Sequence, residues 1–152
     1  MKPAQLVVLL TILFFVADIG VIHAVTPADL PAQAAAGDAQ AQFELGKKYN
    51  HGLDKAVKKN YIKAEKWLKE AAAQNHSEAM FHLGVMQETG RGFIPDAVAA
   101  ADWYLEAANG GNPDAMYTLS LMYEEGRGVP QDPVEAAFWY QRATDVWSNP
   151  TK

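Results

Sequence analysis

Two kinds of amphipathic helix alternate along the chain between residues 39 and 144. The first kind carries a small or apolar residue at positions i, i+4 and i+8, as in Ala41, Leu45 and Tyr49. The second carries them at i, i+3, i+4 and i+7, as in Ala100, Trp103, Tyr104 and Ala107. Each spacing gives one apolar stripe on a helix. Neither stripe can be buried by its own helix, whereas stacked helix pairs bury both. The pattern therefore predicts an all-α protein built of helix pairs.

The helix pairs form an internal repeat. The positions that recur 36 residues later without a gap are Ala79, Leu83, Gly90, Arg91, Gly92, Asp96, Ala100, Trp103, Tyr104 and Ala107. Residues 39–75 fit the same pattern with two extra residues in a lysine-rich loop. A period in this range is typical of helical solenoids. We predict a right-handed α-solenoid domain over residues 39–152, with helix-turn-helix repeats at about 39–75, 76–111 and 112–147.

Small residues have defined positions within each repeat. Gly46, Gly84 and Ser120 follow the leucine that recurs in the first helix of each repeat, where a small residue lets a neighbouring helix approach closely. Gly90 and Gly126 follow the first helices of repeats two and three. Glycine tolerates positive φ and is common just after a helix. These glycines are therefore expected to end the first helices and turn the chain.

The first residues predict export. Met1 and Lys2 give a short positive end, residues 6–16 are apolar apart from Thr11, and Ala24 is a small residue at a cleavage position. This pattern is typical of a secretory signal peptide over residues 1–24. The alternative is an uncleaved membrane anchor, and in both cases the repeats lie outside the cytoplasm. Residues 25–38 are interpreted as a linker and an N-terminal capping helix, the second half of an incomplete repeat, which ends at Gly37.

Composition and charge exclude some classes of function. The net charge is −5 and there is no cysteine. A negative chain is a poor partner for nucleic acid, and without cysteine there is no disulfide, thiolate zinc site or cysteine nucleophile. Lysines gather in repeat one, whereas residues 78–145 hold 11 acidic residues against three arginines. This asymmetry indicates either a bipolar molecule that steers a partner or ordinary solvated helix faces.

The repeat resembles the Sel-like repeat (SLR), a relative of the tetratricopeptide repeat. Repeat three carries the pattern most completely, in Ala115, Leu119, Tyr123, Gly126, Gly128, Val129, Asp132, Ala136, Trp139, Tyr140 and Ala143. Repeat two departs from it at Gln87 and Phe93, repeat one lacks the Gly-x-Gly-Val block, and repeat three has Ser120 where the family has glycine. The resemblance covers about residues 39–144. It implies a protein that binds other proteins and assembles complexes, often in bacterial envelopes.

The first helices are expected to line a concave face. Their second apolar set and its acidic edge form the predicted partner-binding face: Phe81, His82, Val85, Met86, Glu88, Tyr117, Leu121, Met122 and Glu124. Methionine and aromatic side chains suit adaptable binding surfaces. The alternative is that these residues pack against the flanking first helices. Trp147, just after the last repeat, is either a cap for the final helix or an exposed anchor for a partner.

Catalytic patterns are weak. Glu78 and His82 are one helical turn apart, but the sequence offers no third metal ligand nearby and no nucleophile–base pair. We therefore predict a non-enzymatic periplasmic module, without cofactor or metal, that binds a protein or peptide and does not enter the membrane after signal cleavage. The alternative is a periplasmic immunity protein that neutralises a delivered toxin. A β-lactam-binding or hydrolysing enzyme is a weaker third hypothesis, since the cysteine-rich relatives linked to that activity have cysteines that this chain lacks. The oligomeric state is left open.

Overall fold

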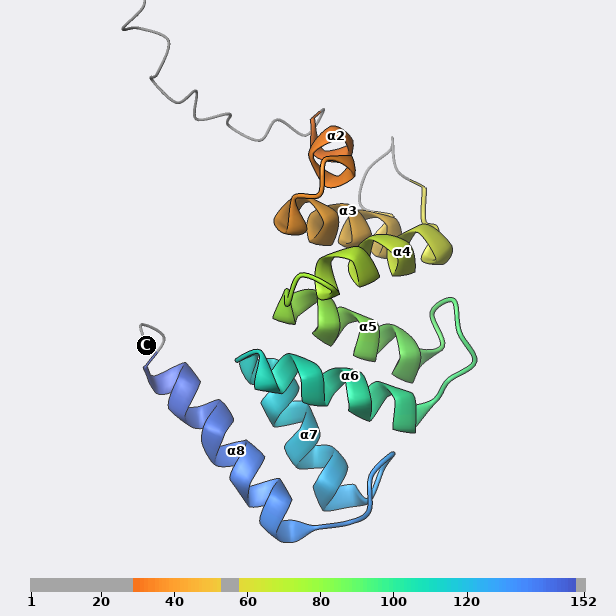
Figure 1. Ribbon diagram of the computed structural model, residues 1–152. Coiled ribbons are helices and arrows are strands. Elements are labelled where there is room, and N and C mark those ends of the chain that lie inside the picture. Colours follow the sequence, from red (N-terminus) through yellow and green to blue (C-terminus); the bar gives the residue numbers. More distant parts are fainter. Residues whose placement is uncertain (1–28, 53–57, 150–152) are drawn as a thin grey trace, which may run out of the picture.

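The computed structural model describes residues 29–52 and 58–149, and this part of the chain folds into seven α-helices without a strand (Figure 1). The helices are α2 (Leu30–Ala35), α3 (Ala39–His51), α4 (Tyr61–Ala72), α5 (Ser77–Thr89), α6 (Ala97–Asn109), α7 (Pro113–Glu125) and α8 (Pro133–Ser148). Each helix packs on the next one in the chain, so that the pairs α3–α4, α5–α6 and α7–α8 stack in order. The predicted all-α repeat fold is confirmed.

A polar side chain marks the start of each repeat helix. The carboxylate of Asp38 accepts a hydrogen bond from the backbone N–H of Ala41 at the start of α3. Asn60, His76, Asp96, Asn112 and Asp132 accept equivalent bonds at the starts of α4 to α8. Such caps satisfy backbone donors that have no partner within the helix. The helix boundaries are therefore encoded locally in the sequence.

The first helix of each repeat ends at a glycine in the left-handed conformation. These glycines are Gly52, Gly90 and Gly126, with φ of 67°, 70° and 70°. Each donates its N–H to a carbonyl in the last turn of its helix, at Lys48, Met86 and Met122 respectively. This confirms the turn role that the sequence predicts, because a side chain at positive φ is strained.

The core runs between the helix pairs. Its buried members include the alanine, leucine and aromatic residues that define the repeat, such as Ala64, Leu83, Tyr104 and Leu119. The small residue of the first helix lies against the second helix of its own repeat. A Cβ on Gly46 would lie 2.8 Å from Leu68 Cγ, and one on Gly84 would lie 2.6 Å from Tyr104 Cε1. The predicted close approach of the two helices is confirmed.

Helix α2 covers the N-terminal end of the stack. Its Leu30 and Ala34 are buried against Ala41 and Leu45 of α3, which is the half-repeat cap expected from the sequence. The predicted signal peptide, residues 1–24, lies outside the described residues. Within residues 29–52 and 58–149, no helix combines the length and apolar character that a membrane span needs.

Candidate protein-binding surface

The repeat-two members of the predicted face pack against their neighbours. Phe81, His82 and Val85 on α5 are half-buried. The His82 ring lies 5.5 Å from that of Phe43 on α3, and the Phe81 ring lies 5.5 Å from that of Tyr104 on α6, measured between centroids. His82 thus packs against the flanking first helix, which is the alternative role that the sequence left open, whereas Phe81 packs against the second helix of its own repeat.

His82 is held neutral by its surroundings. Burial, the Lys47 ammonium and the nearby His51 ring lower its pKa to about 4, against the opposing effect of Glu44 and Glu78. An imidazole with that pKa carries no charge near neutral pH. His82 therefore contributes a neutral ring to the contact between α3 and α5.

Met86 and Met122 are not surface residues, and the prediction that they anchor a partner is corrected. Both are 0% exposed. They occupy equivalent positions in α5 and α7, and both belong to the main core. Methionine is unbranched and fills irregular core spaces. The spacing along the helix placed them beside the predicted face but did not distinguish exposed from buried positions.

Glu88 links two repeats. Its Oε2 accepts a hydrogen bond of 2.7 Å from the Tyr104 hydroxyl within repeat two, and its Oε1 pairs with the Arg127 guanidinium of repeat three. Arg127 also pairs with Glu125 at 3.0 Å. Burial raises the pKa of Tyr104, so its hydroxyl stays a donor. Glu88 is thus held by both repeats, and it joins them rather than lining a free edge.

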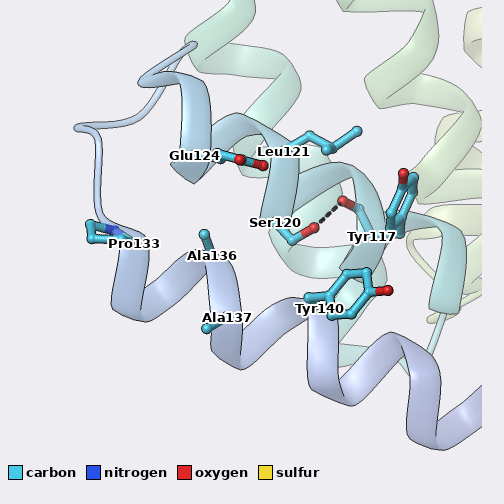
Figure 2. A pocket seen from close by; sticks show the side chains of 8 residues that line it. All are labelled: Tyr117, Ser120, Leu121, Glu124, Pro133, Ala136, Ala137 and Tyr140. Atoms are coloured by element: carbon cyan, nitrogen blue, oxygen red, sulfur yellow. Dashed lines mark hydrogen bonds between the residues drawn. The ribbon is translucent and has the colours of Figure 1, made fainter.

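The repeat-three members of the predicted face lie together at an open pocket. Tyr117, Leu121 and Glu124 of α7 line a pocket of about 430 Å³ together with Pro133, Ala136, Ala137 and Tyr140 of α8 (Figure 2). Ser120 also lines this pocket, and its hydroxyl donates to the Tyr117 carbonyl within α7. Of the predicted residues, these three from repeat three are therefore the ones that the structure gathers around an accessible hollow.

Exposed aromatic side chains lie at one end of that pocket, where Tyr117 and Tyr140 line it (Figure 2) and Trp147 contacts Tyr117. Tyr117, Tyr140 and Trp147 are 38%, 52% and 47% exposed, and the Tyr117 ring lies 6.3 Å from that of Tyr140 and 5.8 Å from that of Trp147. We call these three residues the aromatic surface. Trp147 packs on Tyr117 without being buried, so it is a partial cap that stays accessible. Tyrosine and tryptophan are enriched in protein interfaces.

Tyr140 was not predicted as a site residue, because its repeat position reads as core. The equivalent Tyr104 is 1% exposed. Tyr104 packs over Gly84, where a Cβ would clash with its ring, whereas the residue equivalent to Gly84 in repeat three is Ser120, which has a Cβ. The Cβ of Ser120 occupies the space that the Tyr104 ring takes over Gly84, and no helix of the described residues packs on α8 as α7 packs on α6. This departure from the repeat was visible in the sequence and is the signal that could have identified Tyr140.

The polar groups around the aromatic surface are few. Among the residues that the structure describes, no three His, Asp or Glu side chains are grouped to hold a metal ion. One carboxylate, that of Glu124, lines the same pocket as Tyr117 and Tyr140. Away from that pocket, burial and the nearby Glu135 and Asp132 carboxylates raise the pKa of Tyr123. The pocket thus combines two tyrosine rings with one carboxylate.

Known proteins share both the sequence pattern and the fold. The family model of the Sel1 repeat matches three consecutive segments, residues 39–76, 77–112 and 113–145, which confirms the resemblance inferred from the sequence. The crystal structure of a Sel1 repeat protein from Oxalobacter formigenes is 39% identical, with a TM-score of 0.70, and the match covers 78% of this chain and 87% of that one.

Two further structures are similar. A protective antigen of uropathogenic Escherichia coli that displays an SLR fold is 36% identical with a TM-score of 0.74, and the match covers 80% of this chain but 26% of the antigen. Cysteine rich protein B of Helicobacter pylori is 22% identical with a TM-score of 0.63, over 80% of this chain and 91% of that one, and supports the fold alone. No curated protein matches the sequence.

Proposed function

The chain belongs to the Sel1 repeat family, and we propose that it is an exported protein–protein interaction module of the bacterial envelope. Sel1 repeat proteins are scaffolds for protein interactions. The observation that carries the proposal for this chain is the aromatic surface, in which Tyr117, Tyr140 and Trp147 are held exposed by a packed pair of helices. A preformed surface of rigid aromatic rings loses little conformational entropy when it binds.

Export is supported by the signal-peptide pattern of residues 1–24. The proposal places the mature protein in the periplasm, beginning at Val25. The test is to express the full chain with a C-terminal tag, release the periplasmic contents by osmotic shock and determine the mass of the protein recovered. A measured mass that corresponds to a chain starting at Val25 supports the proposal. A full-length protein that stays in the membrane fraction would replace it with the anchored alternative.

The binding role is tested by purification from an envelope extract, followed by a binding measurement with the purified partner. Supporting evidence is one stoichiometric partner whose affinity falls at least about tenfold when Tyr117 and Tyr140 are both changed to alanine, a loss that corresponds to about 1.4 kcal/mol. Ile62→Ala is the matched control, because Ile62 is an exposed apolar residue on α4, away from this surface. The partner's identity separates an envelope scaffold or regulator from a toxin-neutralising immunity protein. A well-folded bait that retains no partner in any extract would contradict the proposal.

A further inference from the structure

We propose that the end of the solenoid formed by α7 and α8 binds an α-helix of a partner protein in the way that the end formed by α5 and α6 binds α7. The inferred partner helix carries small and apolar side chains on one face and an arginine or lysine just beyond its C-terminus. The site on this chain comprises Tyr117, Leu121, Glu124, Ala137 and Tyr140, which we call the α7–α8 face. The inference rests on the proposed role as a protein-binding module and specifies its binding site and the chemistry of its partner.

The internal repeat provides the comparison. The residues of repeat two that correspond to the α7–α8 face are Phe81, Val85, Glu88, Ala101 and Tyr104. In that repeat α7 packs on α6, and Ala101 and Tyr104 are 4% and 1% exposed. In repeat three Ala137 is exposed and Tyr140 is 52% exposed. Within residues 29–52 and 58–149 no helix covers this face, so it presents the counterpart of a helix-binding surface that is occupied one repeat earlier.

The charge requirement follows from the pair that closes the occupied surface. Arg127 lies just after Gly126, the residue that ends α7, and it pairs with Glu88 of the preceding repeat. The counterpart of Glu88 is Glu124, which is exposed at the pocket between α7 and α8. In the described part of the chain no cation pairs with the Glu124 carboxylate. A helix that binds like α7 and ends in a basic residue would place a cation at this carboxylate, and such charge-assisted pairs add both affinity and orientation.

The other end of the molecule does not offer this partner. Helix α2 already covers α3 there, through Leu30 and Ala34. A second copy bound head to tail would present α2 to the α7–α8 face, and the six residues of α2 include no basic side chain. The predominance of acidic residues in repeats two and three, 11 against three arginines over residues 78–145, also favours a partner with positive charge. The structure therefore points to a different protein rather than to a second copy.

The first probe is a peptide copy of α7, because its binding mode is known from the chain itself. The peptide has the sequence of residues 112–128, with its three acidic residues replaced by the corresponding amides so that its one arginine is its only charged side chain. It is titrated into the ¹⁵N-labelled protein, and chemical shifts of backbone amides and of the tryptophan indoles are recorded. We expect saturable shifts that cluster on Tyr117, Glu124, Tyr140 and Trp147. Shifts confined to another surface, or no saturable change, would overturn the inference.

The second step exchanges charges. Changing Glu124→Arg in the protein, or replacing the arginine of the peptide by glutamate, should each weaken binding about tenfold. Combining the two changes should restore most of the affinity. Glu106→Arg is the control, because Glu106 is also exposed but lies on α6. Circular dichroism shows that each variant is folded. If the two single changes and their combination all bind with the affinity of the wild-type pair, the charge contact is refuted, and with it the α7-like binding mode.

Two further outcomes separate this inference from the proposed function. The natural partner could be captured equally by the wild-type protein and by the double variant Glu124→Arg with Tyr140→Ala. That result would support the proposed protein-binding function and refute the α7–α8 face as its site. If sedimentation shows that the protein alone forms a dimer that Tyr140→Ala dissociates, the α7–α8 face binds a second copy and the inference fails. A monomer whose partner is lost from that double variant, but not from Glu106→Arg, supports it.

Discussion

Changing Gly84 to alanine tests whether the close approach of α5 and α6 determines how Tyr104 packs. A Cβ at residue 84 would lie 2.6 Å from Tyr104 Cε1, 2.7 Å from Cδ1 and 3.1 Å from Cζ. Non-bonded carbon atoms prefer a separation of about 3.5–4.0 Å, so the ring must move by roughly 1 Å. That ring is 1% exposed, and its hydroxyl donates to Glu88 at 2.7 Å. The displacement therefore strains the core and disturbs a hydrogen bond to a carboxylate.

The net effect of Gly84→Ala can be worked out from three contributions. Overpacking of a core costs about 1–3 kcal/mol. A weakened hydrogen bond to a charged acceptor adds up to about 1.5 kcal/mol. Alanine in place of glycine within a helix returns about 1 kcal/mol. We expect the free energy of unfolding to fall by about 2 kcal/mol, which in a domain of this size lowers Tm by roughly 8 °C.

The assay is urea unfolding followed by circular dichroism and by tryptophan fluorescence, whose coincidence checks that unfolding is two-state. Ser120→Ala is the matched control, because residue 120 occupies the same position in repeat three and already carries a Cβ; its effect should stay below about 1 kcal/mol. In a Tyr104→Ala background the cost of Gly84→Ala should largely disappear, since the ring that it displaces is gone. An unchanged cost in that background would refute the steric explanation.

Four further predictions follow from the same contacts. Tyr104→Phe removes the donor to Glu88 and should lower the free energy of unfolding by about 1–2 kcal/mol in urea melts. Arg127→Gln, at a half-exposed ion pair, should cost about 0.5 kcal/mol, and salt should reduce the difference. Asn50→Leu should stabilise the protein by about 1–2 kcal/mol, because both polar side-chain atoms of Asn50 are buried without a hydrogen-bond partner among the described residues, and such groups are costly. The folded-state pKa of His82, about 4, lies below its ordinary value, so the folded state binds fewer protons than the unfolded state. The free energy of unfolding should therefore have its full value above about pH 6.5 and decrease as the pH falls towards about 4. In His82→Gln this decrease should be smaller.

The sequence predicted the fold because the relevant interactions are local. Capping residues such as Asp38 and Asn112, and glycines such as Gly90 and Gly126, set the helix boundaries at positions that can be read along the chain. The stripes of apolar residues then require stacked pairs. None of this depends on knowing which side of a given helix faces solvent, so the repeat pattern was sufficient.

The candidate binding surface was harder to predict because exposure depends on what packs against each repeat. Tyr104 and Tyr140 occupy the same position in the repeat pattern, yet one is core and the other surface. The helical spacing also could not separate Phe81, which packs on Tyr104, from Tyr117, which lies in an exposed cluster. Burial is decided by the neighbouring repeat and by the Cβ of Ser120, and neither effect appears in the period of the sequence.

The differences among the three repeats, rather than their common pattern, distinguish the proposed binding face. The position of Glu88 is occupied by Asn50 in repeat one and by Glu124 in repeat three. Asn50 is buried, and the residue of repeat one at the position of Tyr104 is Leu68, which has no hydroxyl, so that repeat has no equivalent contact. Glu88 is held by Tyr104 and Arg127 and is fully used within the fold. Glu124 has the same carboxylate, but among the described residues no cation pairs with it as Arg127 pairs with Glu88. It lies at a face whose aromatic residues are exposed. In a repeat protein, equivalent positions become buried when another helix stacks on them. The Glu124 carboxylate and the rings of Tyr117 and Tyr140 stay accessible at such positions. A helix from another protein that bound there would bury these rings and could pair a cation with the carboxylate, as the proposed binding mode requires.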